Sequence, residues 1–136
     1  MSDCIQLGGV QAFLAVGIGA IVGACLRVRF ILLLNVIFSI TYFPTLLVNL
    51  FACFLLGVIY GLQNTNHSYS SCSASSLFLL TGFLGSLSTF STFIFELYQA
   101  IDDKKFGESL SLLFASLVGG LIAIRIGYLV IYASVD

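Results

Sequence analysis

Four long apolar segments, separated by short polar stretches, constrain this chain more than any other feature of its sequence. Their approximate bounds are 8–30, 44–62, 77–98 and 109–132. Each is close to the roughly 20 residues that an α-helix needs to cross the hydrocarbon core of a bilayer. Only 8% of the 136 residues are charged, against roughly 25% in a typical soluble protein. The sequence therefore predicts one all-α membrane domain of four transmembrane helices over residues 1–136.

The basic residues are divided unevenly between the two sides of the predicted membrane domain. Four spans place both termini on one side, together with the polar loop 63–76; we name this side A and the opposite side B. Arg27, Arg29, Lys104 and Lys105 fall on side B, and Arg125 lies in the last span toward side A. Because cytoplasmic loops are enriched in Lys and Arg, this distribution favours a multi-pass protein of the cell (inner or plasma) membrane with both termini outside.

Several function classes are excluded by the polar residues that the chain does contain. A net charge of -1 does not suit nucleic-acid binding, which requires clustered Lys and Arg. The single histidine, His67, falls in the polar loop. The sequence shows no pairing of a nucleophile with a base of the kind that would indicate an enzyme. The four cysteines lack the spacing of a zinc site. We interpret Cys25 and Cys53, which lie in apolar runs, as inert buried thiols.

Two polar residues in the first two spans each allow two interpretations. Gly19, Gly23 and Arg27 lie four residues apart and share one helix face. This stripe is either a packing seam that ends in a snorkelling arginine or the approach to a vestibule where Arg27 attracts anions. Asn49 lies well inside the second span, where its amide either bonds across helices or lines a hydrated path and donates to a ligand.

The third span is the most informative segment. Five of seven consecutive residues carry hydroxyl groups: Ser86, Ser88, Thr89, Ser91 and Thr92. Gly82 and Gly85 precede them, and Phe90 and Phe93 are three apart, hence on one face. This composition predicts a helix broken at mid-membrane, where exposed backbone groups bind ions. The alternative is a continuous helix whose hydroxyls bond to its own carbonyls.

Three ordered motifs resemble the CrcB/Fluc fluoride channel family. The strongest is GFLGSLSTFSTFIFE at residues 82–96, which is similar to the family pattern GF-x-G-x-x-T-T-F-S-T-F-x-x-E. The second is TLLVNLFACFLLG at 45–57, and the third is GAIVGACLR at 19–27. The motifs follow the family's order, and the resemblance covers nearly the whole chain in length and in the sequence of spans.

The resemblance implies an anion path lined by particular side chains. Phe90 and Phe93 match the pore phenylalanines that meet fluoride, and Asn49 matches the pore amide. Ser91 and Thr92 match residues that supply hydroxyls near the path. The positive edges of aromatic rings suit an anion, so the implied chemistry agrees with the residue types.

The resemblance also implies an assembly and a structural ion. Family members form antiparallel, dual-topology dimers with two narrow pores, either homodimers or heterodimers of paralogous subunits. Gly85 and Ser88 match residues whose backbone carbonyls bind a structural Na+ at the dimer centre, and Arg27 matches a vestibule arginine. Ser88 replaces a threonine of the motif, which a backbone ligand tolerates.

The expected function is a fluoride-selective channel that exports cytoplasmic fluoride passively and so lowers its toxicity. One alternative is a non-conducting or half-active subunit of a heteromeric fluoride channel. Another is a small dual-topology drug/proton antiporter, which would need an intramembrane carboxylate to exchange protons. The first two spans hold no carboxylate, and Glu96 lies near the end of the third. The expected partners are fluoride, the lipid bilayer and a second subunit, without nucleic acid.

Overall fold

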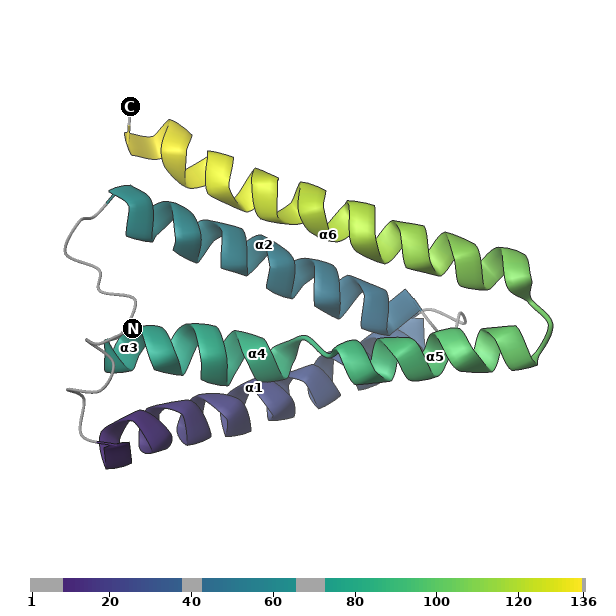
Figure 1. The fold of residues 1–136 in the computed structure, drawn as a ribbon, viewed down its shortest axis with the longest axis horizontal. Coiled ribbons are helices and arrows are strands. Elements are labelled where there is room, and N and C mark those ends of the chain that lie inside the picture. Colours follow the sequence, from purple (N-terminus) through teal and green to yellow (C-terminus); the bar gives the residue numbers. More distant parts are fainter. Residues whose placement is uncertain (1–8, 38–42, 66–72, 136) are drawn as a thin grey trace.

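The chain is a bundle of long helices in a computed structural model that describes residues 9–37, 43–65 and 73–135. All regular structure within these ranges is helical (Figure 1). Four helical stretches are long and apolar enough to cross a membrane: Gly9–Ile37, Phe43–Asn64, Ala74–Asp102 and Phe106–Ser134. The prediction of an all-α protein with four candidate transmembrane helices is therefore confirmed.

Helices α2 (Phe43–Thr65) and α6 (Phe106–Val135) pack side by side along most of their length (Figure 1). Glycines make this close approach possible on both helices. A methyl group on Gly57 would collide with the backbone of Ile124, and one on Gly127 would collide with the backbone of Phe54. Small residues let helix backbones meet in this way in membranes.

Helix α1 (Gly9–Ile37) packs along the first half of the third span (Figure 1). Its buried residues are Gly19 and Gly23. A methyl group on Gly19 would meet the backbone of Gly82 at 3.1 Å, and one on Gly23 would meet the carbonyl group of Phe83. The glycine stripe of the first span is therefore a packing seam. The helix continues to Ile37, beyond the predicted end at residue 30, because the apolar run continues; residues 38–42 lie outside the described residues.

The third span is assembled from four helical pieces. They are α3 (Ala74–Ser76), the π-helical segment η2 (Leu77–Leu84), α4 (Gly85–Leu87) and α5 (Phe90–Asp102). Ser88 and Thr89 separate α4 from α5 with extended backbone, at ψ 151° for Ser88 and at φ -146°, ψ 120° for Thr89. The side chain of Thr89 caps α5 by accepting from the N–H of Thr92. The interruption is visible as the thin stretch between α4 and α5 in Figure 1.

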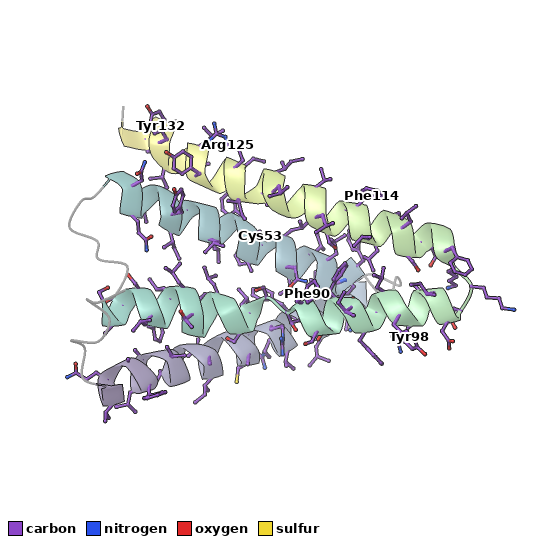
Figure 2. All side chains as sticks on the ribbon, viewed as in Figure 1. Cys53, Phe90, Tyr98, Phe114, Arg125 and Tyr132 are labelled. Atoms are coloured by element: carbon purple, nitrogen blue, oxygen red, sulfur yellow. The ribbon has the colours of Figure 1, made fainter. Side chains whose placement is uncertain are left out.

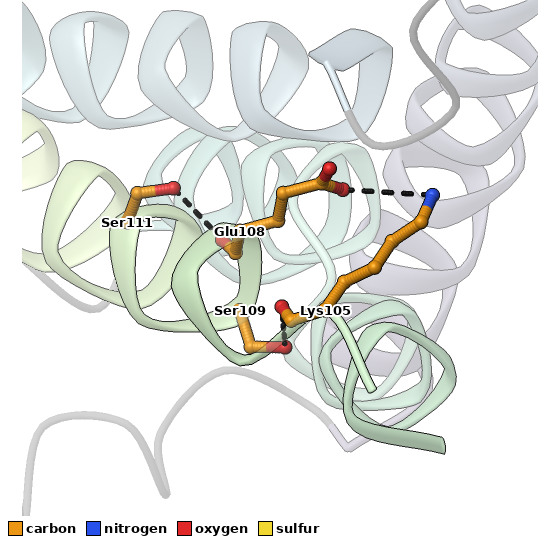
Figure 3. Close-up of polar contacts among 4 residues, drawn as sticks. All are labelled: Lys105, Glu108, Ser109 and Ser111. Atoms are coloured by element: carbon orange, nitrogen blue, oxygen red, sulfur yellow. Dashed lines mark hydrogen bonds and ion pairs between the residues drawn. The ribbon is translucent and has the colours of Figure 1, made fainter. Parts of the chain in front are cut away.

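A tight turn joins α5 to α6. Lys104 adopts a φ of 60°, and its N–H donates to the carbonyl of Ile101 at 2.9 Å. The first turn of α6 is fixed by the Ser109 hydroxyl, which donates to the carbonyl of Lys105 at 3.2 Å, and by an ion pair of 3.7 Å between Lys105 and Glu108 (Figure 3). Residues 99–108, which lie between the third and fourth predicted spans, are thus mostly helical, since α5 ends at Asp102 and α6 begins at Phe106.

The interior of the single chain is small. Its buried apolar cluster consists of Val48, Ala52, Leu84 and Leu87. Large apolar side chains on every long helix are exposed, among them Phe13 at 82% and Leu121 at 71%. A surface of this kind requires lipid or another subunit to cover it, in agreement with the four candidate membrane spans.

Candidate functional site

Asn49 on α2 binds the interruption of the third span from the side. Its Oδ1 accepts from the N–H of Thr89 at 3.0 Å, and its Nδ2 donates to the carbonyl of Thr89 at 3.4 Å. One amide therefore satisfies both backbone groups of a residue that has no place in either α4 or α5. An asparagine amide carries two hydrogens, so the second hydrogen of Nδ2 remains to donate elsewhere.

A cavity of about 210 Å³ lies beside this contact. It is lined by Asn49, Cys53, Ser88, Thr89, Phe90, Phe93, Ser116 and Leu117. Three elements contribute: α2, the interrupted third span and α6. The cavity brings together the three residues that sequence analysis assigned to the centre of an anion path, Asn49, Phe90 and Phe93. The amide bonds across helices, as the first interpretation of Asn49 holds, and it also lines this cavity.

Phe90 and Phe93 lie on one face of α5 and form an aromatic pair. Their ring centroids are 6.1 Å apart and the rings are inclined at 44°. Phe93 is 5% exposed, whereas Phe90 is 74% exposed. Figure 2 shows Phe90 at the start of α5, beside the interruption, and Cys53 on α2. Phe93 is therefore packed inside the bundle, whereas most of the Phe90 ring lies on the surface of the single chain.

The hydroxyls of Ser86 in α4 and of Ser88 at the start of the interruption bond to the preceding helix. Ser86 donates to the carbonyl of Phe83, and Ser88 donates to that of Leu84, each at 3.1 Å. This bonding pattern is the one that the alternative interpretation of the third span proposed. It accounts for these two residues, but the helix does not continue beyond them.

The hydroxyls after the interruption gather around Thr89. Its Oγ1 lies 3.1 Å from the Oγ of Ser91 and 3.4 Å from the Oγ1 of Thr92. Ser91 and Thr92 do not line the cavity described above. Within the described part of this chain they stabilise the start of α5, and Thr89 itself faces Asn49. The sequence alone does not distinguish Thr89 from its hydroxyl neighbours, because only a structure reveals which hydroxyl residue leaves the helix.

A second cavity, of about 140 Å³, adjoins the first, and Cys53 and Ser88 line both. Gly85 also lines it. In a continuous α-helix the Gly85 carbonyl would accept from the N–H four residues on, which belongs to Thr89. That N–H instead binds Asn49. The interruption therefore deprives the Gly85 carbonyl of its usual helical donor and leaves an oxygen of the type that binds hard cations.

Two further residues, Cys53 and Ser116, line the cavities. Cys53, interpreted as an inert buried thiol, is half-buried and lines both cavities. Its position one helical turn after Asn49 is the signal that places both on one face. Ser116 on α6 also lines the first cavity, and its Oγ is buried without a hydrogen-bond partner in the described chain. A hydroxyl without a partner beside a cavity is available to a ligand or water.

A carboxylate lies farther along α5. The hydroxyl of Thr45, which is 3% exposed, donates to Oε1 of Glu96. Oε2 of Glu96 is buried and has no hydrogen-bond partner in the described chain. Arg27 is half-buried on α1 and lines neither cavity, and within the described residues no ion pair joins it to Glu96. The single chain therefore leaves Arg27 outside the group of residues around Asn49.

Comparison with known proteins identifies what the chain is similar to. The model of the family described as "CrcB-like protein, Camphor Resistance (CrcB)" matches residues 14–128. A protein of Prochlorococcus marinus named "Fluoride-specific ion channel FluC 1" is 39% identical over 93% of this chain and 95% of its own length. A protein of Haemophilus ducreyi named "Fluoride-specific ion channel FluC" is 38% identical over 86% of this chain and 89% of its own length. A protein of the same name from Haemophilus influenzae (strain PittGG) is 43% identical over 82% of this chain and 86% of its own length.

Proposed function

Since the chain belongs to the CrcB-like family, we propose that it is a fluoride-selective channel of the cell (inner or plasma) membrane that lets cytoplasmic fluoride leave passively. The observation that carries this function is the cavity where the Asn49 amide and the rings of Phe90 and Phe93 converge at the interruption of the third span. Its relatives' names supply the ion, and the cavity supplies a place for that ion to pass.

The chemistry of the cavity suits a small, strongly hydrated anion. The remaining Nδ2 hydrogen of Asn49, the hydroxyl of Ser116 and the ring edges of the phenylalanines replace part of the water that fluoride gives up. None of the residues that line the cavity carries a charge. Conduction requires a site that binds an ion and then releases it, so neutral donors serve this purpose better than a fixed cation would.

The proposal includes an antiparallel, dual-topology dimer with two pores, built from two copies of this chain or from this chain and a paralogous subunit. The 74% exposure of the Phe90 ring supports this arrangement, because a pore residue has to be enclosed. The broad apolar surface of the single chain supports it as well. We further propose that Ser91 and Thr92, whose hydroxyls meet Thr89, lie near the path, and that Arg27 attracts anions into a vestibule.

A structural Na+ completes the proposal. The break of the third helix would lie at mid-membrane, and the backbone carbonyls of Gly85 and Ser88 would hold the ion at the dimer centre. The donor set fits, since Gly85 has lost its helical donor to Asn49 and Ser88 has extended backbone. Carbonyl oxygens are the ligands that broken membrane helices offer to Na+. The bound ion would neutralise the carbonyl dipoles that meet there.

Purified protein in liposomes tests the function. Vesicles are loaded with fluoride, the outer solution is monitored with a fluoride electrode, and the potential set up by the efflux is released with a potassium ionophore. We expect rapid fluoride efflux and none of chloride from matched chloride-loaded vesicles. Folded, reconstituted protein that releases no fluoride would contradict the proposed channel, and equal release of chloride would contradict its selectivity.

A further inference from the structure

Arg125 is a cation with no carboxylate partner in the part of the chain that the structure describes. It is exposed on α6, and Figure 2 shows it on the outer edge of that helix, on the side turned away from the third span. Among the described residues no carboxylate forms an ion pair with it; the ion pair that the structure does contain joins Lys105 to Glu108. The proposed anion path does not use Arg125, since neither cavity includes it.

Arg125 falls within the hydrocarbon region of a bilayer when either the level of the first cavity or the middle of α6 is taken as the bilayer centre. Measured from Ser116, at the level of the first cavity, it lies about 13 Å farther along the helix; measured from the midpoint of Phe106–Val135, it lies about 7 Å away. Both distances are smaller than the roughly 15 Å half-thickness of the hydrocarbon core. A guanidinium at this depth reaches toward the headgroups rather than remaining among acyl chains.

The neighbours of Arg125 form a polar and aromatic cluster at the side A ends of α2 and α6. The guanidinium carbon lies 5.7 Å from the ring centroid of Tyr128. The Nδ2 of Asn64 donates to the Tyr128 hydroxyl at 3.2 Å, so that this hydroxyl directs its own proton elsewhere. Tyr60 and Tyr132 flank Tyr128 at centroid distances of 5.7 and 6.2 Å. Tyrosines are enriched at this level of membrane proteins, where one end of the ring is apolar and the other is hydrated.

We infer that Arg125 and the Tyr128 hydroxyl bind the phosphate group of a membrane phospholipid. The phosphates of the bilayer are the anions that lie just beyond the depth of Arg125, and a guanidinium binds phosphate with two parallel hydrogen bonds. The hydroxyl proton of Tyr128 supplies a third donor, and the exposed rings of Tyr60 and Tyr132 face the upper acyl chains. An anionic headgroup such as phosphatidylglycerol fits better than a zwitterionic one, because its phosphate has no amine of its own to pair with.

The test measures how far phosphatidylglycerol raises the thermal unfolding midpoint of the purified full-length protein in detergent. We expect Arg125→Gln to lose at least half of the rise and Tyr128→Phe to lose a smaller part, while Arg125→Lys retains more of it than Arg125→Gln. The control is Arg29→Gln, which removes an exposed arginine from α1 on the opposite side and should keep most of the rise. Tyr128→Phe retains the ring and the charge, so it remains informative even where Arg125→Gln does not fold.

Three outcomes would overturn the inference. Inorganic phosphate that raises the midpoint as much as phosphatidylglycerol would show that no lipid is required. Diacylglycerol that raises it as much would show that the phosphate is not recognised. A change of subunit number caused by Arg125→Gln in lipid-free detergent would assign Arg125 to a contact with a second subunit. None of these measurements depends on fluoride flux, so a failure of the lipid inference can be told apart from a failure of the proposed channel function.

Discussion

Replacing Asn49 with aspartate tests whether the amide both holds the interruption and serves an anion. Asparagine and aspartate have nearly the same shape, so Asn49→Asp changes chemistry and little else. The new carboxylate would still accept from the N–H of Thr89, the contact of 3.0 Å. It would lose the donor that faces the Thr89 carbonyl at 3.4 Å and place a negative oxygen against that carbonyl.

The magnitudes separate the structural effect from the effect on conduction. Loss of one partly buried hydrogen bond costs about 1 kcal/mol, and an unmatched polar contact raises this to about 3 kcal/mol. Two negative charges about 4 Å apart repel by about 4 kcal/mol at an effective dielectric constant of about 20. At about 1.4 kcal/mol per tenfold change, fluoride occupancy of the cavity would fall about a thousandfold. We therefore expect flux to fall by at least about a hundredfold while the protein still folds.

The assay is fluoride-electrode efflux from liposomes that contain equal amounts of folded protein, with folding checked by chromatography and thermal unfolding. The matched control is Gln99→Glu, which makes the same amide-to-acid change at an exposed position near the end of α5. We expect the fluoride flux of Gln99→Glu to stay within about twofold of the wild type, because a charge that is exposed and lies outside the cavity is screened. An Asn49→Asp protein that folds and conducts within about threefold of the wild type would refute the role of the amide, whatever the control does.

Three other substitutions test separate parts of the structure. Phe93→Ile should lower fluoride efflux at least about tenfold and the free energy of unfolding by about 1–2 kcal/mol, because it removes a 5% exposed ring that lines the cavity. Unchanged efflux would exclude the ring from the path. Gly127→Ala should lower the free energy of unfolding by about 2 kcal/mol or more, because the new methyl group meets the backbone of α2. In the control Gly17→Ala, the methyl group meets nothing within 4 Å and should not destabilise the protein. Equal thermal unfolding midpoints of the two variants would argue against the packing of α2 on α6. Thr45→Val should cost about 1–3 kcal/mol in the same assay by leaving the Glu96 carboxylate without its hydroxyl partner, with Thr45→Ser close to the wild type; a stable Thr45→Val protein would mean that another group satisfies the carboxylate.

The spans were predictable because lipid imposes a simple rule on sequence. Every backbone group in the hydrocarbon core needs an internal partner, so a long apolar run indicates a helix with little ambiguity. The glycine seam at Gly19 and Gly23 was predictable for a similar reason, since small residues at helical spacing let backbones approach. The end of α1 was less predictable, because an apolar run without Gly or Pro has no local signal that stops the helix at residue 30.

The membership of the cavity was predictable only in part. Asn49, Phe90 and Phe93 stand out in the sequence because a buried amide and a paired aromatic motif are unusual in an apolar helix. Cys53 does not, because its contribution depends on how α2 rotates about its axis against α6, and that rotation is set by glycine contacts between distant residues. The hydroxyls after the interruption turn to Thr89, since a cap for α5 is needed wherever the helix restarts.

The distribution of charge connects the fold to the proposed conduction. The described residues that line the two cavities include no Lys, Arg, Asp or Glu. The positive residues Arg27, Arg29 and Arg125 lie elsewhere on α1 and α6 and are at least partly exposed. A cation outside the cavity raises the local concentration of anions without holding them, because attraction acts over distance. Neutral donors inside it replace the ion's water for the short time of its passage. The same division leaves Arg125 without a carboxylate partner among the described residues, so the proposed phospholipid phosphate would pair with a cation that the neutral path does not use.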